Sequence, residues 1–224
     1  MANYNTISKL YDLLDKTYFS EKGESPRKVI RNLIPNSSIN VLDMCCGTLA
    51  NTFSIAKSST LLKITGVDIS KEMLNVAEKK CRDANLQNVC LRCEDATNMK
   101  IDNETFDYVI IGLVLHECSP KLRQKMINEA FRVLKKDGRL IILEWEQQKS
   151  IIRKIKFFPL YMTESMGCLS FNNFYRCNKE SYFKQFDFLI EKEISCNYSV
   201  VMEFKKNHAS SRYSITDKET NLKV

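Results

Sequence analysis

Residues 39–50, INVLDMCCGTLA, decide the fold of this chain. The first of them form a short apolar run with branched side chains, which is typical of a buried parallel strand. The run ends at Asp43, and residues 45–48 then turn the chain into a helix that we expect to begin near Leu49. A strand, a tight turn with a glycine and a helix N-terminus are together typical of a loop that binds a nucleotide.

A second apolar run, Leu61 to Val67, ends in Asp68. A carboxylate at the end of the second strand of such a unit can accept hydrogen bonds from both hydroxyls of a ribose. The loop and this acid therefore predict a site for a cofactor that contains adenosine.

The glycine content of the loop distinguishes two kinds of cofactor. A nicotinamide dinucleotide needs the pattern G-x-G-x-x-G, because its pyrophosphate requires close approach of the backbone. The loop here, Cys45 to Ala50, contains one glycine, Gly47. S-adenosylmethionine carries no phosphate and needs less glycine. From Ile39 to Trp145 the sequence resembles the class I S-adenosylmethionine-dependent methyltransferases.

Strands and helices alternate along the rest of the chain. Three further strands and a closing hairpin are expected at 88–94, 106–113, 140–143, 188–196 and 198–204. Such alternation predicts a parallel sheet with right-handed crossovers, and Asp137-Gly138 is expected to be the turn before the fifth strand. The predicted class is α/β: a Rossmann-like class I methyltransferase fold with a seven-stranded, mostly parallel sheet, a C-terminal antiparallel hairpin and helices on both faces.

Serines and prolines indicate where several helices begin. A helix is expected to start at Ser25-Pro26, with proline in its first position. Ser70 and Ser119 are expected to be N-caps of two more helices. The apolar face predicted for the helix after Ser119 consists of Leu122, Met126, Ile127, Ala130, Val133 and Leu134.

The resemblance implies a role for each acid at a strand end. Asp43 would help to hold the methionine half of the cofactor, and Asp68 would bind the ribose. Asp95 with Ala96 would meet the amino edge of the adenine, and Ile69 and Met73 would lie on either side of its ring. The remaining residues expected to bind the cofactor are Tyr11, Cys45, Gly47, Thr48, Leu49, Gly112 and Leu113.

Two positions in the loop depart from the family pattern. Members of the family usually have glycine at the positions of Cys45 and Leu49. Glycine lets the backbone approach the cofactor, so Leu49 is expected to crowd its amino-acid end unless the helix begins elsewhere. This departure supports an alternative in which the chain is a non-catalytic scaffold.

Methyl transfer requires a nucleophile held in line with the methyl group, and a base only where the acceptor starts protonated. His116, at the edge of the crevice, is the candidate base; it can equally be a polar residue at a helix entry. Tyr18 could orient the acceptor or belong to the core. Residues 11–14 and 115–117 resemble the small-molecule branch, including ubiquinone and menaquinone C-methyltransferases and their type-11 neighbours.

Composition bounds the organisation of the chain. A length of 224 residues suits one domain, predicted over 1–208, with N-terminal helices in 1–37, an acceptor lid in 149–178 and a disordered tail in 209–224. Nine cysteines and the lack of a recognisable signal peptide predict a cytoplasmic protein with free thiols. No metal site is expected, because Cys90 and Cys93 lie on one strand without a second ligand pair.

The acceptor is the least determined part of the function. Residues 150–168 mix basic and apolar side chains, which suits a lipophilic or anionic acceptor, contact with a membrane surface, or an ordinary lid. The net charge of +7 permits RNA as an alternative substrate. Residues 112–115 lack the Asn/Asp-Pro-Pro-aromatic motif used for methylating the amino groups of bases, so a small molecule is favoured. The oligomeric state is not predicted.

Overall fold

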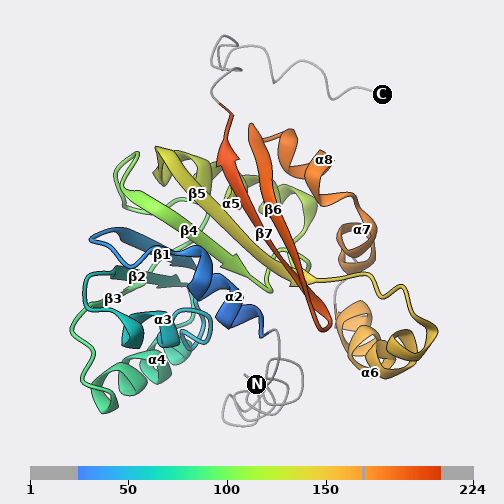
Figure 1. Cartoon of the computed structure of the whole chain (residues 1–224), viewed down its shortest axis with the longest axis horizontal. Helices are drawn as coiled ribbons and strands as arrows, with labels where there is room; N and C mark the ends of the chain where they lie inside the picture. Colours follow the sequence, from blue (N-terminus) through green and yellow to red (C-terminus); the bar gives the residue numbers. More distant parts are fainter. Residues whose placement is uncertain (1–24, 168–169, 208–224) are drawn as a thin grey trace.

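A computed structural model describes residues 25–167 and 170–207. Within them seven strands form one sheet in the order β3-β2-β1-β4-β5-β7-β6 (Figure 1). The strands are β1 Asn40–Met44, β2 Lys63–Asp68, β3 Val89–Cys93, β4 Phe106–Gly112, β5 Leu134–Trp145, β6 Phe188–Cys196 and β7 Ser199–Lys206. The first five are parallel, and β7 is antiparallel to both β5 and β6. The predicted sheet with its closing hairpin is confirmed.

Helices cover both faces of the sheet. They are α2 Pro26–Leu33, α3 Phe53–Ser58, α4 Lys71–Asp83, α5 Pro120–Val133, α6 Ile151–Gly167, α7 Phe171–Arg176 and α8 Lys179–Lys184. Successive strand residues point to opposite faces. Val109 packs in the cluster that includes α5 and α8, whereas Ile110 packs in the cluster that includes α2 and α3.

The predicted helix starts at serine are confirmed. The Ser70 hydroxyl accepts a hydrogen bond from the backbone N–H of Met73, and the Ser119 hydroxyl accepts one from that of Leu122. Each cap satisfies an N–H that has no partner inside its helix. Pro26 occupies the first turn of α2, as expected.

Three local predictions were wrong. The helix expected near Leu49 begins at Phe53, after a turn. Asp137-Gly138 does not precede the fifth strand but lies inside β5, where the pairing with β4 is irregular. Leu122 is 42% exposed, because it lies in the first turn of α5 rather than on the face against the sheet.

Several predictions concern residues outside the described part of the chain. Tyr11, Tyr18, residues 1–24 of the expected N-terminal helical region and the expected tail at 209–224 all lie there. Among residues 25–167 and 170–207, no helix combines the length and apolar character that crossing a bilayer requires.

Candidate active site

A cavity of about 830 Å³ opens at the carboxyl ends of the parallel strands. It lies where the strand order changes direction between β1 and β4, which is where sheets of this kind bind ligands. The predicted site residues that line it are Cys45, Gly47, Thr48, Asp68, Ile69, Met73, Asp95, Ala96, Gly112, Leu113 and His116. Asp43 and Leu49 are not among the lining residues.

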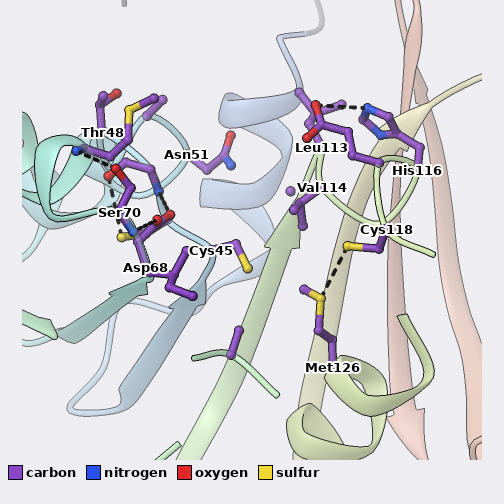
Figure 2. Close-up of a pocket in the computed structure, with 18 of the residues that line it drawn as sticks. Cys45, Thr48, Asn51, Asp68, Ser70, Leu113, Val114, His116, Cys118 and Met126 are labelled. Atoms are coloured by element: carbon purple, nitrogen blue, oxygen red, sulfur yellow. Dashed lines mark hydrogen bonds and ion pairs between the residues drawn. The ribbon is translucent and has the colours of Figure 1, made fainter. Parts of the chain in front are cut away.

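Asp68 joins the loop after β1 to the start of α4. One carboxylate oxygen accepts a hydrogen bond from the N–H of Gly47 at 2.8 Å, and the other accepts one from the N–H of Ser70 at 2.9 Å (Figure 2). Each oxygen retains a lone pair. The carboxylate is therefore fixed in place with acceptor capacity for a ribose diol.

The loop itself holds three residues in the left-handed region, Cys45, Gly47 and Leu49, with φ of 60°, 52° and 63°. With this backbone conformation, the side chain of Leu49 is fully buried beside Leu74 and Ala77 of α4. The leucine thus packs between the sheet and a helix. The expected crowding of the cofactor does not arise from its side chain, because the helix begins four residues later.

Asp43 lies beneath the loop, fully buried. One of its oxygens accepts a hydrogen bond from the Thr52 hydroxyl at 2.6 Å. Burial raises the pKa of Asp43 to about 7, and the charge of Asp68 adds to this, against the opposing effect of the Thr52 hydrogen bond. Asp43 does not line the cavity, and its bond from Thr52 ties the end of β1 to the residue before α3.

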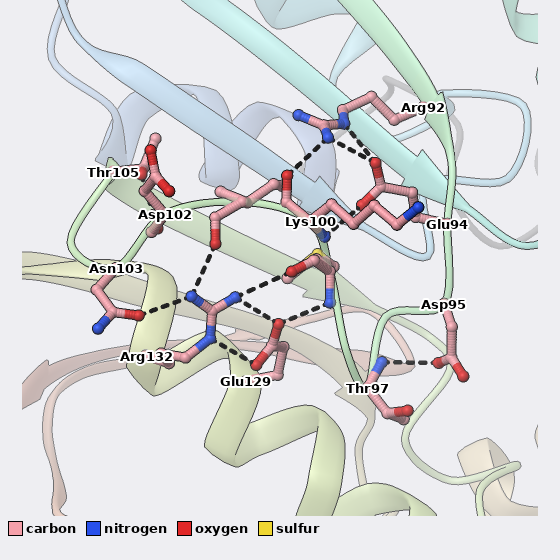
Figure 3. Close-up of polar contacts among 12 residues, drawn as sticks. Arg92, Glu94, Asp95, Thr97, Lys100, Asp102, Asn103, Thr105, Glu129 and Arg132 are labelled. Atoms are coloured by element: carbon pink, nitrogen blue, oxygen red, sulfur yellow. Dashed lines mark hydrogen bonds and ion pairs between the residues drawn. The ribbon is translucent and has the colours of Figure 1, made fainter.

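The end of the cavity expected to hold adenine combines an acid with apolar side chains. The backbone N–H of Thr97 donates to Asp95 at 2.8 Å, which holds the pKa of that carboxyl below its usual range (Figure 3). Ile69 is 75% exposed and Met73 is half-buried, and both line the cavity. These groups fit an aromatic ring that carries an amino edge.

Arg132 fixes the segment that follows β3. Its guanidinium donates to both carboxylate oxygens of Glu129, at 2.7 and 2.8 Å, and to the carbonyl of Ile101 at 2.7 Å (Figure 3). Glu129 in turn accepts from the N–H of Met99 at 2.7 Å. The segment that carries Asp95 is therefore fastened to α5.

The opposite end of the cavity is built around His116, which is 2% exposed. Its Nδ1 lies 2.7 Å from an oxygen of Glu144, whose other oxygen accepts from the N–H of Leu115 at 3.0 Å. Nε2 lies 3.3 Å from Glu164 and 3.9 Å from Glu117. Burial alone would lower the pKa of His116, but Glu144 and Glu164 outweigh it and raise the pKa to about 10.

Arg123 holds the turn that carries His116. It is buried and donates to the carbonyls of Leu115 and Cys118, each at 2.8 Å. Its guanidinium carbon lies 4.0 Å from the centre of the Phe174 ring. A planar donor between two carbonyls and an aromatic face locks the turn in one conformation.

Several residues of the site escaped the sequence analysis. Glu144 carried one detectable signal, an acid inside the apolar run IILEW, whereas Glu164 and Arg123 lie within helices and carried none. Asn51 lines the cavity beside Gly112, where a Cβ would fall 2.4 Å from the Asn51 amide nitrogen. Further lining residues that were not predicted are Arg27, Ser70, Lys80, Thr97, Val114, Cys118, Met126 and Trp145.

The cysteine pair of the loop is divided between two environments. Cys45 lines the cavity, while Cys46 packs in the cluster with Leu49. Burial raises the pKa of both thiols, so neither is a thiolate at neutral pH. Cys90 and Cys93 are exposed on β3.

The sheet order, the antiparallel hairpin and the acid held beneath a loop with one glycine define a class I S-adenosylmethionine-dependent methyltransferase. Residues 41–138 match the family model described as a methyltransferase domain. The chain is 32% identical over 181 residues to the demethylmenaquinone methyltransferase of Staphylococcus saprophyticus, covering 80% of this chain and 75% of that protein. The chain therefore belongs to this methyltransferase family, and its methyl donor is S-adenosylmethionine.

Solved structures agree on the fold. A methyltransferase dependent on S-adenosylmethionine from Aquifex aeolicus aligns with a TM-score of 0.65 at 17% identity, over 91% of this chain and 98% of that chain. One from Methanosarcina mazei aligns with a TM-score of 0.58 at 22% identity, over 80% and 97%.

Proposed function

We propose that this methyltransferase modifies a small, lipophilic molecule by direct in-line transfer. The observation that carries the proposal is that one cavity joins the loop and acids of the cofactor end to a second wall, formed by Leu113, Val114, His116, Trp145 and Glu164. A donor and an acceptor can therefore meet in the same space. S-adenosylmethionine would supply an activated methyl group: an electron pair of the acceptor would bond to the methyl carbon as the carbon–sulfur bond breaks, and S-adenosylhomocysteine would leave with the electrons of that bond.

The residues at the cofactor end would position the donor. Asp68 is proposed to accept the ribose hydroxyls, and Asp95 with Ala96 to meet the adenine edge. Ile69 and Met73 would lie against the ring. The polar atoms of the loop and the backbone of Gly112 and Leu113 would bind the amino-acid half, with Asp43 supporting the loop from below.

His116 would act on the acceptor. With a pKa raised to about 10 by Glu144 and Glu164, against the effect of burial, its ring is an imidazolium at neutral pH. An imidazolium cannot remove a proton, but it donates a strong hydrogen bond to an anionic oxygen. We therefore assign His116 the stabilisation of a deprotonated acceptor oxygen, in place of the base role expected from the sequence.

The lid helix α6 supports a lipophilic acceptor. Phe157 and Leu160 are buried beside Trp145, while Ile151, Ile152 and Ile155 are 72%, 63% and 69% exposed. Exposed basic residues alternate with these isoleucines at Arg153, Lys154 and Lys156. A helix with exposed apolar and basic side chains suits the surface of an anionic membrane, from which a lipophilic acceptor could enter. The relatives at 32% identity are named for demethylmenaquinone, which agrees with this class.

A transfer assay tests the acceptor class. The protein would be supplied with methyl-labelled S-adenosylmethionine and either a prenylated hydroquinone in anionic vesicles, a hydroquinone without the tail, or total RNA. We expect label in the prenylated compound, and less in the compound without the tail. Label in RNA alone would contradict the proposal.

The scaffold alternative loses its structural support, because Leu49 lies outside the cavity wall.

The membrane contact has a separate test. Co-sedimentation with anionic vesicles should fall when Ile151 and Ile155 are both replaced by serine, and should fall with added salt. Replacing exposed Val76 of α4 by serine gives a matched control on another helix. Equal sedimentation of all three proteins would refute the contact.

A further inference from the structure

Three side chains at the acceptor end of the cavity converge with their ligand atoms toward one point. His116 and Glu117 come from the turn after β4, and Glu164 comes from the lid helix α6. One ligand atom from each lies within 4.8 Å of those of the other two. All three residues line the cavity, so the point that they surround is open to the acceptor.

The imidazole is oriented as metal-binding imidazoles usually are. Its Nδ1 is held 2.7 Å from Glu144, and this contact directs Nε2 toward Glu164 and Glu117. Nε2 is buried, and within residues 25–167 and 170–207 it has no hydrogen bond of good geometry; its nearest carboxylate is that of Glu164, an ion pair at 3.3 Å. A carboxylate behind the imidazole, with the second nitrogen facing other carboxylates, is the arrangement that fixes histidine ligands of metals.

The charges favour a cation at this point. In the part of the chain that the structure describes, three carboxylates lie within 4 Å of the His116 ring nitrogens, those of Glu144, Glu164 and Glu117. A proton on the ring balances one of these negative charges, whereas a divalent cation in its place balances two. Unbalanced charge is costly in a site that is partly closed to water.

We propose that His116, Glu117 and Glu164 bind a divalent cation that takes the place of the Nε2 proton, with Glu144 as the positioning residue behind His116. In this metal-bound form the ion, rather than an imidazolium, would face the acceptor oxygen. The separations of 3.3 and 3.9 Å from Nε2 to the two carboxylates are near the roughly 3.4 Å that ligands keep around a tetrahedral ion. One imidazole and two carboxylates suit Mn²⁺ or Zn²⁺. Because all three residues line the cavity, an oxygen of the acceptor would be able to reach the bound ion; this last role rests on the proposed function.

Binding of Mn²⁺ to the full chain tests the site directly. After treatment with a chelator, the protein would be titrated with Mn²⁺ at neutral pH, and free Mn²⁺ followed by electron paramagnetic resonance. We expect one ion per chain, with affinity lowered roughly 10- to 100-fold in Glu164→Gln and in Glu144→Gln. Glu180→Gln, at an exposed position in the first turn of α8, is the matched control and should bind as the unmodified chain does.

Nuclear magnetic resonance of the imidazoles locates the ion. The chain has two histidines, so a His208→Gln variant leaves the signals of His116 alone. Bound Mn²⁺ should broaden these signals beyond detection, and Glu164→Gln should restore them. The proposal is overturned if Mn²⁺ does not bind in a one-to-one ratio, if it leaves the His116 signals sharp, or if Glu164→Gln binds it equally well.

The acceptor assay and the metal assay fail independently. Calorimetry with S-adenosylmethionine shows that each variant is folded, because Glu164 and Glu144 lie away from the acids of the cofactor end. If the unmodified chain binds Mn²⁺ but transfers no methyl group to lipophilic acceptors, the proposed substrate class is refuted and the metal site stands. Transfer that continues without Mn²⁺ binding would refute the metal site alone.

Discussion

Replacing Asp68 by alanine should abolish most of the affinity for S-adenosylmethionine. The carboxylate is held by the N–H groups of Gly47 and Ser70 at 2.8 and 2.9 Å, and this fixes it as an acceptor for two ribose hydroxyls. Hydrogen bonds to a charged group contribute about 1.5–3 kcal/mol each. Loss of two such bonds should therefore raise the dissociation constant roughly 10²- to 10⁴-fold, at about 1.4 kcal/mol for each factor of ten.

The variant also loses an acceptor within the fold, so its stability must be measured alongside binding. The N–H groups of Gly47 and Ser70 would each lose their partner, at a cost of about 1–3 kcal/mol in the free energy of unfolding if water does not replace it. Isothermal titration calorimetry gives the affinity, and thermal unfolding shows whether the variant is folded. Asp83→Ala, at the exposed end of α4, is the matched control.

The result that would refute this reasoning is a folded Asp68→Ala protein that binds S-adenosylmethionine within about threefold of the unmodified chain, a difference of less than 1 kcal/mol. The ribose would then be bound by residues other than Asp68, and the Asp68 carboxylate would only stabilise the conformation of the loop.

Four further predictions follow from buried groups of the site. Burial raises the pKa of Asp43 from 3.8 to about 7, so the free energy of unfolding should be highest below pH 3.8 and should fall as the pH rises through about 7. The fall is at most roughly 4 kcal/mol. Urea unfolding at several pH values should show this fall in the unmodified chain and not in Asp43→Asn. Leu49→Gly should lower the free energy of unfolding by about 2–3 kcal/mol, since the loss of a buried leucine exceeds the relief of its left-handed φ, yet leave cofactor affinity unchanged by calorimetry. Arg123→Lys should lower kcat for methyl transfer more than it raises KM for the donor, because lysine cannot donate to both carbonyls in one plane; equal effects on both would contradict this. Gly112→Ala should cost about 1–3 kcal/mol by displacing the Asn51 side chain, and adding Asn51→Ala should recover part of that cost in a double-mutant cycle.

The fold was predictable because its signals are local and repeated. The first two strands appear as apolar runs that end in a polar residue, Asp43 and Asp68. The closing hairpin needed only two alternating segments joined at Asn197, and both are present as β6 and β7. Such patterns depend on neighbouring residues, so one sequence is enough to reveal them.

The errors arose where tertiary packing overrides the local pattern. Leu49 was read from family spacing as a neighbour of the cofactor, but its left-handed backbone accompanies a side chain packed against α4. Gly138 was read as a turn, but it lies in β5, where a Cβ would fall 3.0 Å from the carbonyl oxygen of Asp107. A close approach between two backbones leaves no periodic signal in the sequence.

The acceptor end could not be assembled from sequence for a different reason. Its charged groups come from elements far apart in the chain: Glu164 lies 48 residues after His116, and Glu144 lies 28 after it. Only the topology of the sheet, with β5 beside β4 and α6 after β5, brings these side chains together.

Glu164 lies on α6 and close to His116 of the turn after β4, so a movement of α6 would change the surroundings of that imidazole. If α6 swings away from the sheet to admit a substrate, it takes one carboxylate with it, and His116 loses a counter-ion at the same moment as water enters. Methyl transfer would then be restricted to the closed form, in which the reaction centre is complete and water is excluded. On this proposal, one side chain would couple substrate entry to the chemical step.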